Sequence, residues 1–259
     1  MDIEPHVNLF NLSGKTALIT GSARGIGFAI AAALSQAGAR VILNSRTPGA
    51  LSVAAEQLRG TDRAVEICPF DVCDPDAVEA AVESIERTIA PIDILVNNAG
   101  MQRRAPLERF RNQDWRELMA TNLDSVFYVS KAVAVHMIRR GCGKIINIGS
   151  VQCELARPGI APYTASKGAI KNLTKGMCAD WAPHGLQINA IAPGYFATPL
   201  NQALVEDPVF DAWLRKRTPA GRWGRLEDLH GAAVFLASGA SDFINGQTLY
   251  VDGGILAVI

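Results

Sequence analysis

Short apolar runs alternate with longer amphipathic segments along this chain of 259 residues. The apolar runs predict strands at 16–20, 41–44, 64–68, 93–96, 144–148, 187–191 and 248–251. Between them, apolar positions spaced three and four residues apart predict helices at 26–37, 51–58, 75–88, 112–139, 162–181 and 226–236. Several strands are apolar without alternation, which is typical of a parallel sheet covered by helices on both faces. The alternation and the length predict an α/β fold in a single domain over residues 1–259.

The segment 195–223 departs from this alternation. It follows a predicted strand and is rich in polar, proline and aromatic residues. Ligands of a doubly wound sheet bind beyond the carboxyl ends of its strands, and a long segment there is placed to cover a substrate. We therefore expect residues 195–223 to form a substrate lid.

Composition narrows the function classes. Apolar residues make up 49% of the chain, and 25 Lys and Arg balance 25 Asp and Glu, so bulk charge favours neither nucleic acid nor anionic membrane. No apolar run reaches the roughly 18 residues of a membrane span, and the N-terminal residues lack a secretory pattern. Five scattered cysteines have no metal-ligand spacing. We expect a cytoplasmic protein with free thiols, no metal site, and neither nucleic-acid nor membrane partners.

A glycine-rich turn, TGSARGIG, follows the first predicted strand and leads into a helix. Its Gly21, Gly25 and Gly27 permit a tight turn and a close approach of the backbone to a ligand. The N-terminus of the following helix offers N–H donors and a positive dipole to phosphate. Glycines also occur in ordinary strand-to-helix turns. The position directly after the first strand nevertheless favours a dinucleotide cofactor.

The end of the second predicted strand indicates which dinucleotide. A carboxylate at this point would accept the ribose 2′-hydroxyl of NAD and repel a 2′-phosphate. The chain instead has Asn44, Ser45 and Arg46 here, and Arg24 in the glycine turn. Two guanidinium groups and a hydroxyl suit a phosphate monoester, so we expect NADP. The alternative is that both arginines are ordinary solvated charges.

Tyr163, Lys167 and Ser150 form a candidate set for proton transfer. Tyr163 and Lys167 are four residues apart on one predicted helix, so they share a face. A neighbouring ammonium favours the phenolate, which would bring the tyrosine towards the pKa of a general acid or base. Ser150 ends an apolar strand, where its hydroxyl can bond the reacting oxygen. Each pattern also occurs by chance, and their combination with the glycine turn carries the prediction.

With TGSARGIG, NNAG at 97–100, Ser150, YTASK and PGYFATP at 193–199 in order, the chain resembles the short-chain dehydrogenases/reductases. The resemblance covers residues 12–254 and implies a Rossmann-like, doubly wound parallel sheet of seven strands, usually in a homotetramer. It implies that Tyr163 moves the proton while a hydride passes to or from NADP. It further implies that Ser150 orients the carbonyl, that Lys167 lowers the tyrosine pKa and bonds the nicotinamide ribose, and that Asn122 holds a water linking Lys167 to solvent.

The resemblance, which also implies that Asp71 and Val72 hold the adenine, and the end of the second strand together give the expected cofactor site. Phe196 stands where the family usually has Val or Ile, which narrows the space beside the nicotinamide. The expected cofactor-binding residues are Gly21, Ser22, Arg24, Gly25, Ile26, Gly27, Ser45, Arg46, Asp71, Val72, Asn98, Ala99, Gly100, Tyr163, Lys167, Pro193, Gly194, Phe196 and Thr198.

Other phrases, NNAGMQRR, TPAGRWG and ASDFINGQTLYVDGGILA, are similar to those of family members that act on sugar acids. This resemblance implies interconversion of D-gluconate and 5-dehydro-D-gluconate. A guanidinium binds a carboxylate bidentately, and Arg104 is the residue that the resemblance favours, although an arginine pair with Arg103 is also common on surfaces. The expected substrate residues are Arg104, Ser150, Tyr163 and Glu154, with Gln152 and Tyr195 as further candidates for sugar hydroxyls.

Three alternatives stay open at this point. A 3-oxoacyl-carrier-protein reductase would need a basic docking face, which arginines 103, 104, 109 and 111 keep possible. Another sugar-acid or polyol dehydrogenase would share the catalytic set. A non-catalytic NADP-binding sensor is disfavoured because Ser150, Tyr163, Lys167 and Asn122 are all present. The apolar ending 255–259 predicts burial against a second subunit, and hence a homo-oligomer.

Overall fold

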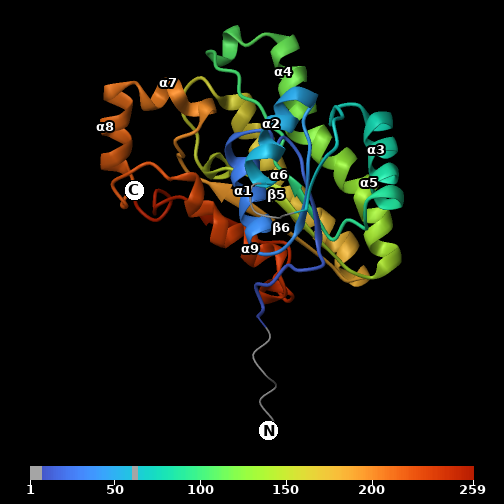
Figure 1. Ribbon diagram of the computed structural model, residues 1–259. Coiled ribbons are helices and arrows are strands. Elements are labelled where there is room, and N and C mark those ends of the chain that lie inside the picture. The colour runs from blue at the N-terminus through green and yellow to red at the C-terminus, as the bar shows by residue number, and fades with distance from the viewer. Residues whose placement is uncertain (1–7, 60–63) are drawn as a thin grey trace.

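The computed structural model describes residues 8–59 and 64–259, and these form a sheet of seven strands between helices (Figure 1). The strands are β1 Thr16–Ile19, β2 Arg40–Leu43, β3 Val65–Ile67, β4 Ile94–Asn97, β5 Gly143–Ile148, β6 Leu186–Pro193 and β7 Thr248–Val251. They lie in the order β3-β2-β1-β4-β5-β6-β7, and every neighbouring pair is parallel. The order turns back between β1 and β4, as in a doubly wound sheet, which brings the loops after these strands together. The predicted fold class and the predicted strands are confirmed.

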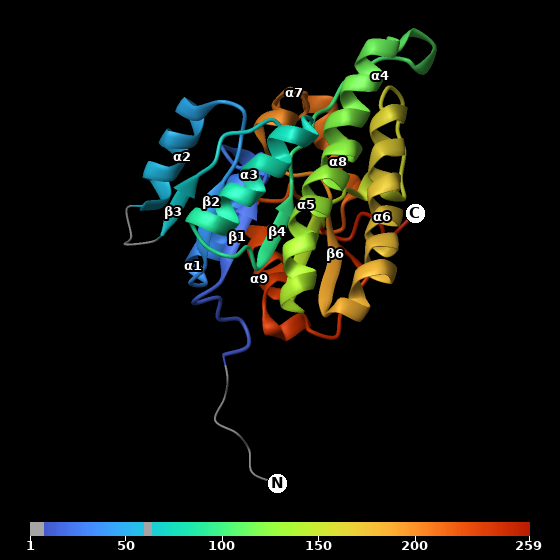
Figure 2. The same ribbon diagram turned by 90° about the vertical axis from the view of Figure 1, so that its right-hand side faces the viewer.

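Helices cover both faces of the sheet (Figure 2). On one face pack α1 Gly25–Gln36, α2 Pro48–Arg59 and α9 His230–Ala237, and on the other α3 Pro75–Thr88, α5 Ser125–Arg140 and α6 Ala161–Trp181. Successive residues of a strand point to opposite faces, so Leu18 of β1 enters one core while Ile19 enters the other. Both side chains are fully buried. This two-sided burial explains why the strands read as continuous apolar runs.

The helix predicted at 112–139 is interrupted. It consists of α4 Asn112–Met119, a π-helical turn Ala120–Asp124, and α5. The wide turn carries Asn122, whose side chain is buried and bonds the backbone of Met101 in both directions. Its Oδ1 accepts the Met101 N–H at 2.8 Å, and its Nδ2 donates to the Met101 carbonyl at 3.0 Å. Spacing of apolar residues could not predict this break, because its polar contact lies 21 residues away in sequence.

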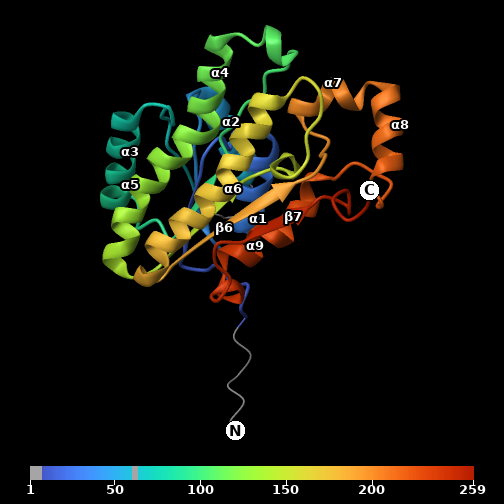
Figure 3. The same ribbon diagram turned by 180° about the vertical axis from the view of Figure 1, so that it is seen from behind.

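The segment predicted as a lid contains two short helices, α7 Gln202–Val205 and α8 Pro208–Arg217 (Figure 3). Asp207 starts α8 by accepting the N–H groups of Val209 and Phe210 at 2.9 and 3.2 Å. Leu214 of α8 is fully buried in a small cluster with Val151, Trp223 and Ile255. The segment is thus packed onto the carboxyl edge of the sheet and is not an extended loop.

The apolar ending differs from its prediction. Ile255 is only 1% exposed, because it packs into the cluster under α8 within its own chain. Burial of the ending against a second subunit is therefore wrong for this residue. Val258 and Ile259 remain exposed, and Arg217 donates to the Val258 carbonyl at 3.0 Å. The fold itself covers the first residue of the ending and leaves the last two uncovered.

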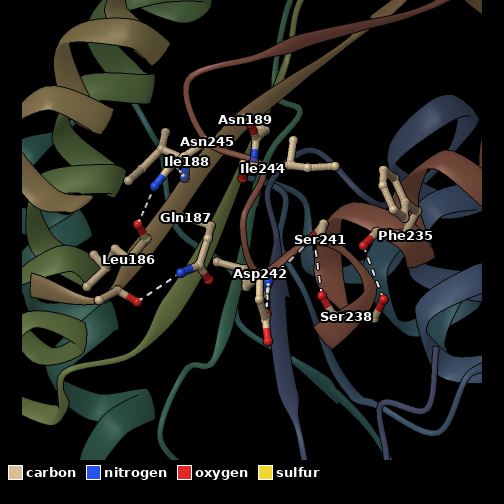
Figure 4. Close-up of polar contacts among 12 residues, drawn as sticks. Leu186, Gln187, Ile188, Asn189, Phe235, Ser238, Ser241, Asp242, Ile244 and Asn245 are labelled. Carbon is tan, nitrogen blue, oxygen red and sulfur yellow. Dashed lines mark hydrogen bonds and ion pairs between the residues drawn. The ribbon is translucent and has the colours of Figure 1, made fainter. Parts of the chain in front are cut away.

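At the opposite edge of the sheet, asparagines fix the loop that leads from α9 into β7 (Figure 4). Asn245 accepts the Ile188 N–H at 2.7 Å and donates to the Leu186 carbonyl at 2.8 Å. Asn189 donates to the Ile244 carbonyl at 2.8 Å. These bonds extend the β6–β7 pairing beyond the strands. They hold β7 in register, so that the loop after β6 is positioned at the carboxyl edge.

Candidate active site

One cavity of about 780 Å³ opens at the carboxyl edge of the sheet, between the loops that follow β1, β2, β4, β5 and β6. Most of the predicted site residues line it. They are Gly21, Arg24, Gly25, Ile26, Ser45, Arg46, Asp71, Val72, Asn98, Ala99, Gly100, Arg104, Ser150, Tyr163, Lys167, Pro193, Gly194, Phe196 and Thr198. The predicted residues that do not line it are Ser22, Gly27, Asn122 and Glu154.

The glycine turn after β1 has no room for side chains at two positions. Gly21 has a φ of 62°, and a Cβ built there would lie 2.8 Å from the Ala99 Cα. A Cβ on Gly27 would lie 2.4 Å from Asn98 Nδ2, which donates to the Gly21 carbonyl at 2.9 Å. Ser22 is buried and donates its hydroxyl to the Ile19 carbonyl at 2.8 Å. Ser22 and Gly27 therefore shape the turn from below, while Gly21 and Gly25 face the cavity.

Asn44 follows β2, and its side-chain hydrogen bonds connect the loop after β2 to the loops after β1 and β3. Its Nδ2 donates to the carbonyls of Cys68 and Phe70, both at 3.1 Å, and its Oδ1 accepts the Gly21 N–H at 3.4 Å. These bonds fix Asn44 at the buried end of the strand, and the residues that follow it face the cavity. The Arg46 side chain is 77% exposed there, with its nitrogen 3.9 Å from an Asp71 oxygen.

Tyr163 and Lys167 lie one turn apart on α6, and Ser150 follows β5. Lys167 is 5% exposed and donates from Nζ to the Ile148 carbonyl at 2.7 Å. The same Nζ lies 5.7 Å from the centroid of the Tyr163 ring. Ser150 accepts the Gln152 N–H at 3.2 Å and is hydrogen-bonded to the Tyr163 side chain. The sheet edge and one helix face thus bring the three predicted groups into one arrangement.

Burial dominates the titration of this arrangement. It raises the pKa of Tyr163 to about 12, while the Ser150 hydrogen bond and the Arg104 charge act in the opposite direction. It lowers the pKa of Lys167 from 10.5 to about 8. The sequence predicted a lowered tyrosine pKa, and the protein's own groups set the reverse direction. Loss of solvation of the phenolate exceeds the stabilisation from neighbouring charge.

Asn122 lies behind the cavity and not on its wall. A Cβ built on Gly100 would lie 3.5 Å from Asn122 Oδ1 and 4.0 Å from Lys167 Nζ, so Gly100 separates the two side chains. Asn122 Nδ2 also lies 3.2 Å from Ser166 Oγ on α6. The carboxamide therefore joins the loop after β4 to the helix that carries Tyr163 and Lys167.

A second arginine faces the cavity beside Arg104. The sequence did not single out Arg157, which lies in the irregular loop after β5 and belongs to no motif. Arg103 points elsewhere, with its nitrogens 3.8 and 3.6 Å from Asp114 and Glu117. Within residues 8–59 and 64–259, Arg104 and Arg157 form no ion pair with a carboxylate. Burial, and then the charge of Arg157, lower the pKa of Arg104.

Two of the further candidates meet here. Gln152 is 6% exposed, lines the cavity, and donates from Nε2 to the Tyr195 hydroxyl at 3.3 Å. Its Oε1 is buried without a hydrogen-bond partner among the described residues. Arg157 is also hydrogen-bonded to Tyr195, and both neighbours oppose the burial that raises the pKa of this tyrosine. This end of the cavity is therefore rich in donors.

Glu154 does not belong to this set. Its carboxylate is paired with Lys171 of α6 and accepts the Tyr250 hydroxyl at 2.5 Å. These contacts lower the pKa of Glu154 and use its acceptors away from the cavity. The structure thus places Glu154 outside the lining of the cavity, and its contact with the substrate stays a prediction.

No group of three or more His, Cys, Asp or Glu side chains in residues 8–59 and 64–259 could hold a metal ion. None of the helices described there is long and apolar enough to cross a membrane. The polar groups that line the cavity include hydroxyls, carboxamides, guanidinium groups, the Lys167 ammonium, the Asp71 carboxylate and backbone groups.

Known proteins are similar to this one over nearly the whole chain. Residues 21–256 match the protein family described as Enoyl-(Acyl carrier protein) reductase. The chain is 60% identical to a gluconate 5-dehydrogenase of Gluconobacter oxydans over 96% of its length and 98% of the relative's. It is 53% identical to a 5-keto-D-gluconate 5-reductase of Escherichia coli, over 97% of this chain and 99% of that one. A crystal structure of a gluconate 5-dehydrogenase from Burkholderia cenocepacia, in complex with NADP and tartrate, is 57% identical with a TM-score of 0.95, covering 97% and 99% of the two chains. The chain therefore belongs to the short-chain dehydrogenase/reductase family.

Proposed function

We propose that the chain is an NADP-dependent oxidoreductase that interconverts D-gluconate and 5-dehydro-D-gluconate. The observation that carries this proposal is the convergence of Ser150, Tyr163 and Lys167 in one cavity with Arg104, which forms no ion pair with a carboxylate of the described residues. A hydroxyl group that can donate a proton and a guanidinium in the same site suit a substrate that has both a ketone and a carboxylate. The names of the relatives at 60% and 53% identity support the same substrate pair.

The residues around the glycine turn fit a dinucleotide with a 2′-phosphate. Gly21 and Gly25 face the cavity and leave the backbone open to a pyrophosphate, at the N-terminus of α1. Arg24, Ser45 and Arg46 line the part of the cavity beyond β2, where no carboxylate closes the strand. These residues would hold the cofactor, which when bound would supply the redox chemistry: a hydride from NADPH for reduction of the substrate carbon, or acceptance of one by NADP⁺ for its oxidation. Structures of relatives with bound NADP support this choice.

The protein's own groups then move the proton. In the reducing direction, Tyr163 gives its hydroxyl proton to the substrate oxygen, and its high pKa keeps it protonated at neutral pH. Ser150 holds the same oxygen by a hydrogen bond. Lys167 remains mostly charged at neutral pH and stabilises the phenolate that forms. Asn122 acts by positioning α6 through Ser166, and not by contact with the substrate.

Replacing Arg46 by alanine is expected to weaken NADPH binding about tenfold to a hundredfold, because one charge-assisted bond contributes about 1.5–3 kcal/mol. NADH, which lacks the 2′-phosphate, should bind the variant as it binds the wild type. Fluorescence titration of both coenzymes measures the two effects. Arg59→Ala is the control, since this arginine donates to the Val65 carbonyl and does not line the cavity. Equal losses for the two coenzymes would refute a phosphate contact.

A substrate panel tests the function itself. Purified protein is assayed for NADPH formation with D-gluconate and for NADPH oxidation with 5-dehydro-D-gluconate, beside 2-dehydro-3-deoxy-D-gluconate, neutral polyols and a 3-oxoacyl thioester. We expect the highest kcat/KM for the gluconate pair. Preference for the 3-oxoacyl thioester would sink the proposal and favour the carrier-protein alternative. Preference for the deoxy acid would move it to the activity named for relatives at 41–45% identity.

Two assembly features belong to the same proposal. We propose that residues 195–223 act as a lid, supported by the contacts of Tyr195 in the cavity with Phe210, Trp213 and Trp223, at centroid distances of 5.6, 6.4 and 6.0 Å. Tryptophan emission that does not change when coenzyme and gluconate are added would count against a lid.

We also propose a homotetramer, supported by the exposed apolar Val258 and Ile259. A monomer in light scattering would rule this out.

A further inference from the structure

Arg157 is the charged group in the cavity that neither the motifs nor the proposed proton transfer uses. Its guanidinium carbon lies 5.3 Å from the centroid of the Phe210 ring on α8. Its side chain is also hydrogen-bonded to Tyr195, and Tyr195 accepts the Nε2 of the buried Gln152 at 3.3 Å. An aromatic face and a phenol thus hold this arginine at the cavity wall, and a carboxamide in turn bonds the phenol. A guanidinium over an aromatic ring keeps its in-plane N–H donors directed outward.

Two like charges converge at this end of the cavity. Arg104 and Arg157 both line it, and the charge of Arg157 lowers the pKa of Arg104. Neither arginine forms an ion pair with a carboxylate of residues 8–59 or 64–259, whereas the neighbouring Arg103 pairs with Asp114 and Glu117. Close like charges without a counter-ion cost free energy, and an anion placed between them removes that cost.

The side chains of Tyr195 and Gln152 indicate which kind of anion fits this site. The Tyr195 hydroxyl interacts with the donors of Gln152 and Arg157, so its own O–H is left to donate to a ligand. Gln152 adds a buried Oε1 without a partner, which can accept a hydroxyl proton. Donors for an anion next to an acceptor for a hydroxyl match a carboxylate attached to a hydroxylated carbon.

We propose that Arg157 is a second carboxylate-binding residue, which faces Arg104 across the cavity and holds the carboxylate of a polyhydroxy acid between the two guanidinium groups. This inference rests on the proposed sugar-acid activity and identifies the residue that selects for the acid. Because Arg157 also packs on Phe210, the bound carboxylate is joined to helix α8. A neutral polyol of the same length would lack this contact.

The kinetic test compares an acid with its neutral analogue. In the protein with saturating NADP⁺, Arg157→Ala is expected to raise KM for D-gluconate about tenfold to a hundredfold, with a much smaller change in kcat. KM for D-glucitol, which has CH₂OH in place of the carboxylate, should stay near the wild-type value. Arg157→Lys keeps the charge and should recover part of the loss. Arg103→Ala, which changes the adjacent arginine outside the cavity, should leave both KM values unchanged.

A binding test separates this inference from the proposed function. L-tartrate, a hydroxy acid that is not a C6 substrate, is titrated calorimetrically into the NADP⁺-loaded protein. Arg157→Ala should weaken its binding about tenfold or more, and Arg103→Ala should not. If no sugar acid is turned over but this difference persists, the proposed function fails and the carboxylate site stands. If wild-type protein does not bind tartrate, or if Arg157→Ala affects D-glucitol as much as D-gluconate, the inference is overturned. Arg157→Gln serves in place of Arg157→Ala if thermal unfolding indicates that the alanine variant does not fold.

Discussion

Replacing Tyr163 by phenylalanine is expected to lower kcat about 100- to 10,000-fold, the range that a positioned general acid or base contributes. The ring keeps its place on α6, and the change removes only the hydroxyl that Ser150 bonds. Ser150 cannot replace it, since its own hydroxyl has no base within the described contacts. NADPH affinity should change little, because the turn after β1 and the residues beyond β2 are untouched. Steady-state rates and fluorescence titration of NADPH measure the two quantities.

Tyr128→Phe provides the matched control. Tyr128 lies on α5, outside the cavity and beside Phe127, so its loss should leave kcat unchanged. A Tyr163→Phe variant that keeps more than about a tenth of the wild-type kcat would contradict the proton-transfer role, since general acid catalysis contributes far more than that. Loss of NADPH binding together with kcat would instead indicate a structural role for the hydroxyl.

The sheet could be predicted from sequence because its signals are local. Each strand is a short apolar run, and the glycine turn has one conformation that only small residues allow. Gly27 illustrates this, because its contact with Asn98 Nδ2 leaves no room for a Cβ. The helix predicted at 112–139 is present, but the π-helical turn within it could not be predicted, for the opposite reason. Its apolar spacing continues through the π-helical turn, which is stabilised by a contact between Asn122 and the distant Met101.

The proposed catalytic residues and the proposed substrate residues differ in the same way. Tyr163 and Lys167 are four residues apart on one helix, so the sequence alone predicts that they share a helix face. The position of Arg157 at the cavity depends on its contacts with Phe210 and Tyr195, which belong to a segment about 40 to 50 residues later in the sequence. Glu154 looked equivalent to Gln152 in sequence, yet a single short turn sends one side chain to the cavity and the other to Lys171. Positions in irregular loops are decided by packing, which a linear pattern does not contain.

Lys167→Met is expected to lower kcat about 100-fold or more while leaving the protein at least nearly as stable as the wild type. The variant fills the same space but cannot stabilise a phenolate, so the proton transfer loses its electrostatic support. Burial lowers the pKa of Lys167 from 10.5 to about 8, which corresponds to about 3 kcal/mol of cost for the buried charge at neutral pH. Against this, the Ile148 carbonyl loses the bond at 2.7 Å, a loss of about 1–3 kcal/mol. Lys171→Met, one turn further along α6, is the control and should keep kcat, because its partner Glu154 lies outside the cavity.

The pH dependence of stability gives this prediction a sign. Between pH 8 and 10.5 the folded protein has released the Lys167 proton while the unfolded chain still binds it, so this lysine adds stability as the pH rises through that window. Below pH 8 both states are protonated and the full cost of the buried charge remains. The free energy of unfolding of Lys167→Met minus that of the wild type should therefore be most favourable to the variant at pH 7.5. By pH 10 this difference should have fallen by up to about 3 kcal/mol. Urea unfolding of both proteins at pH 7.5, 9 and 10 measures the difference. A constant difference would mean that the ammonium is not penalised by its surroundings, and a catalytic lysine held at the expense of stability would then have no basis in this fold.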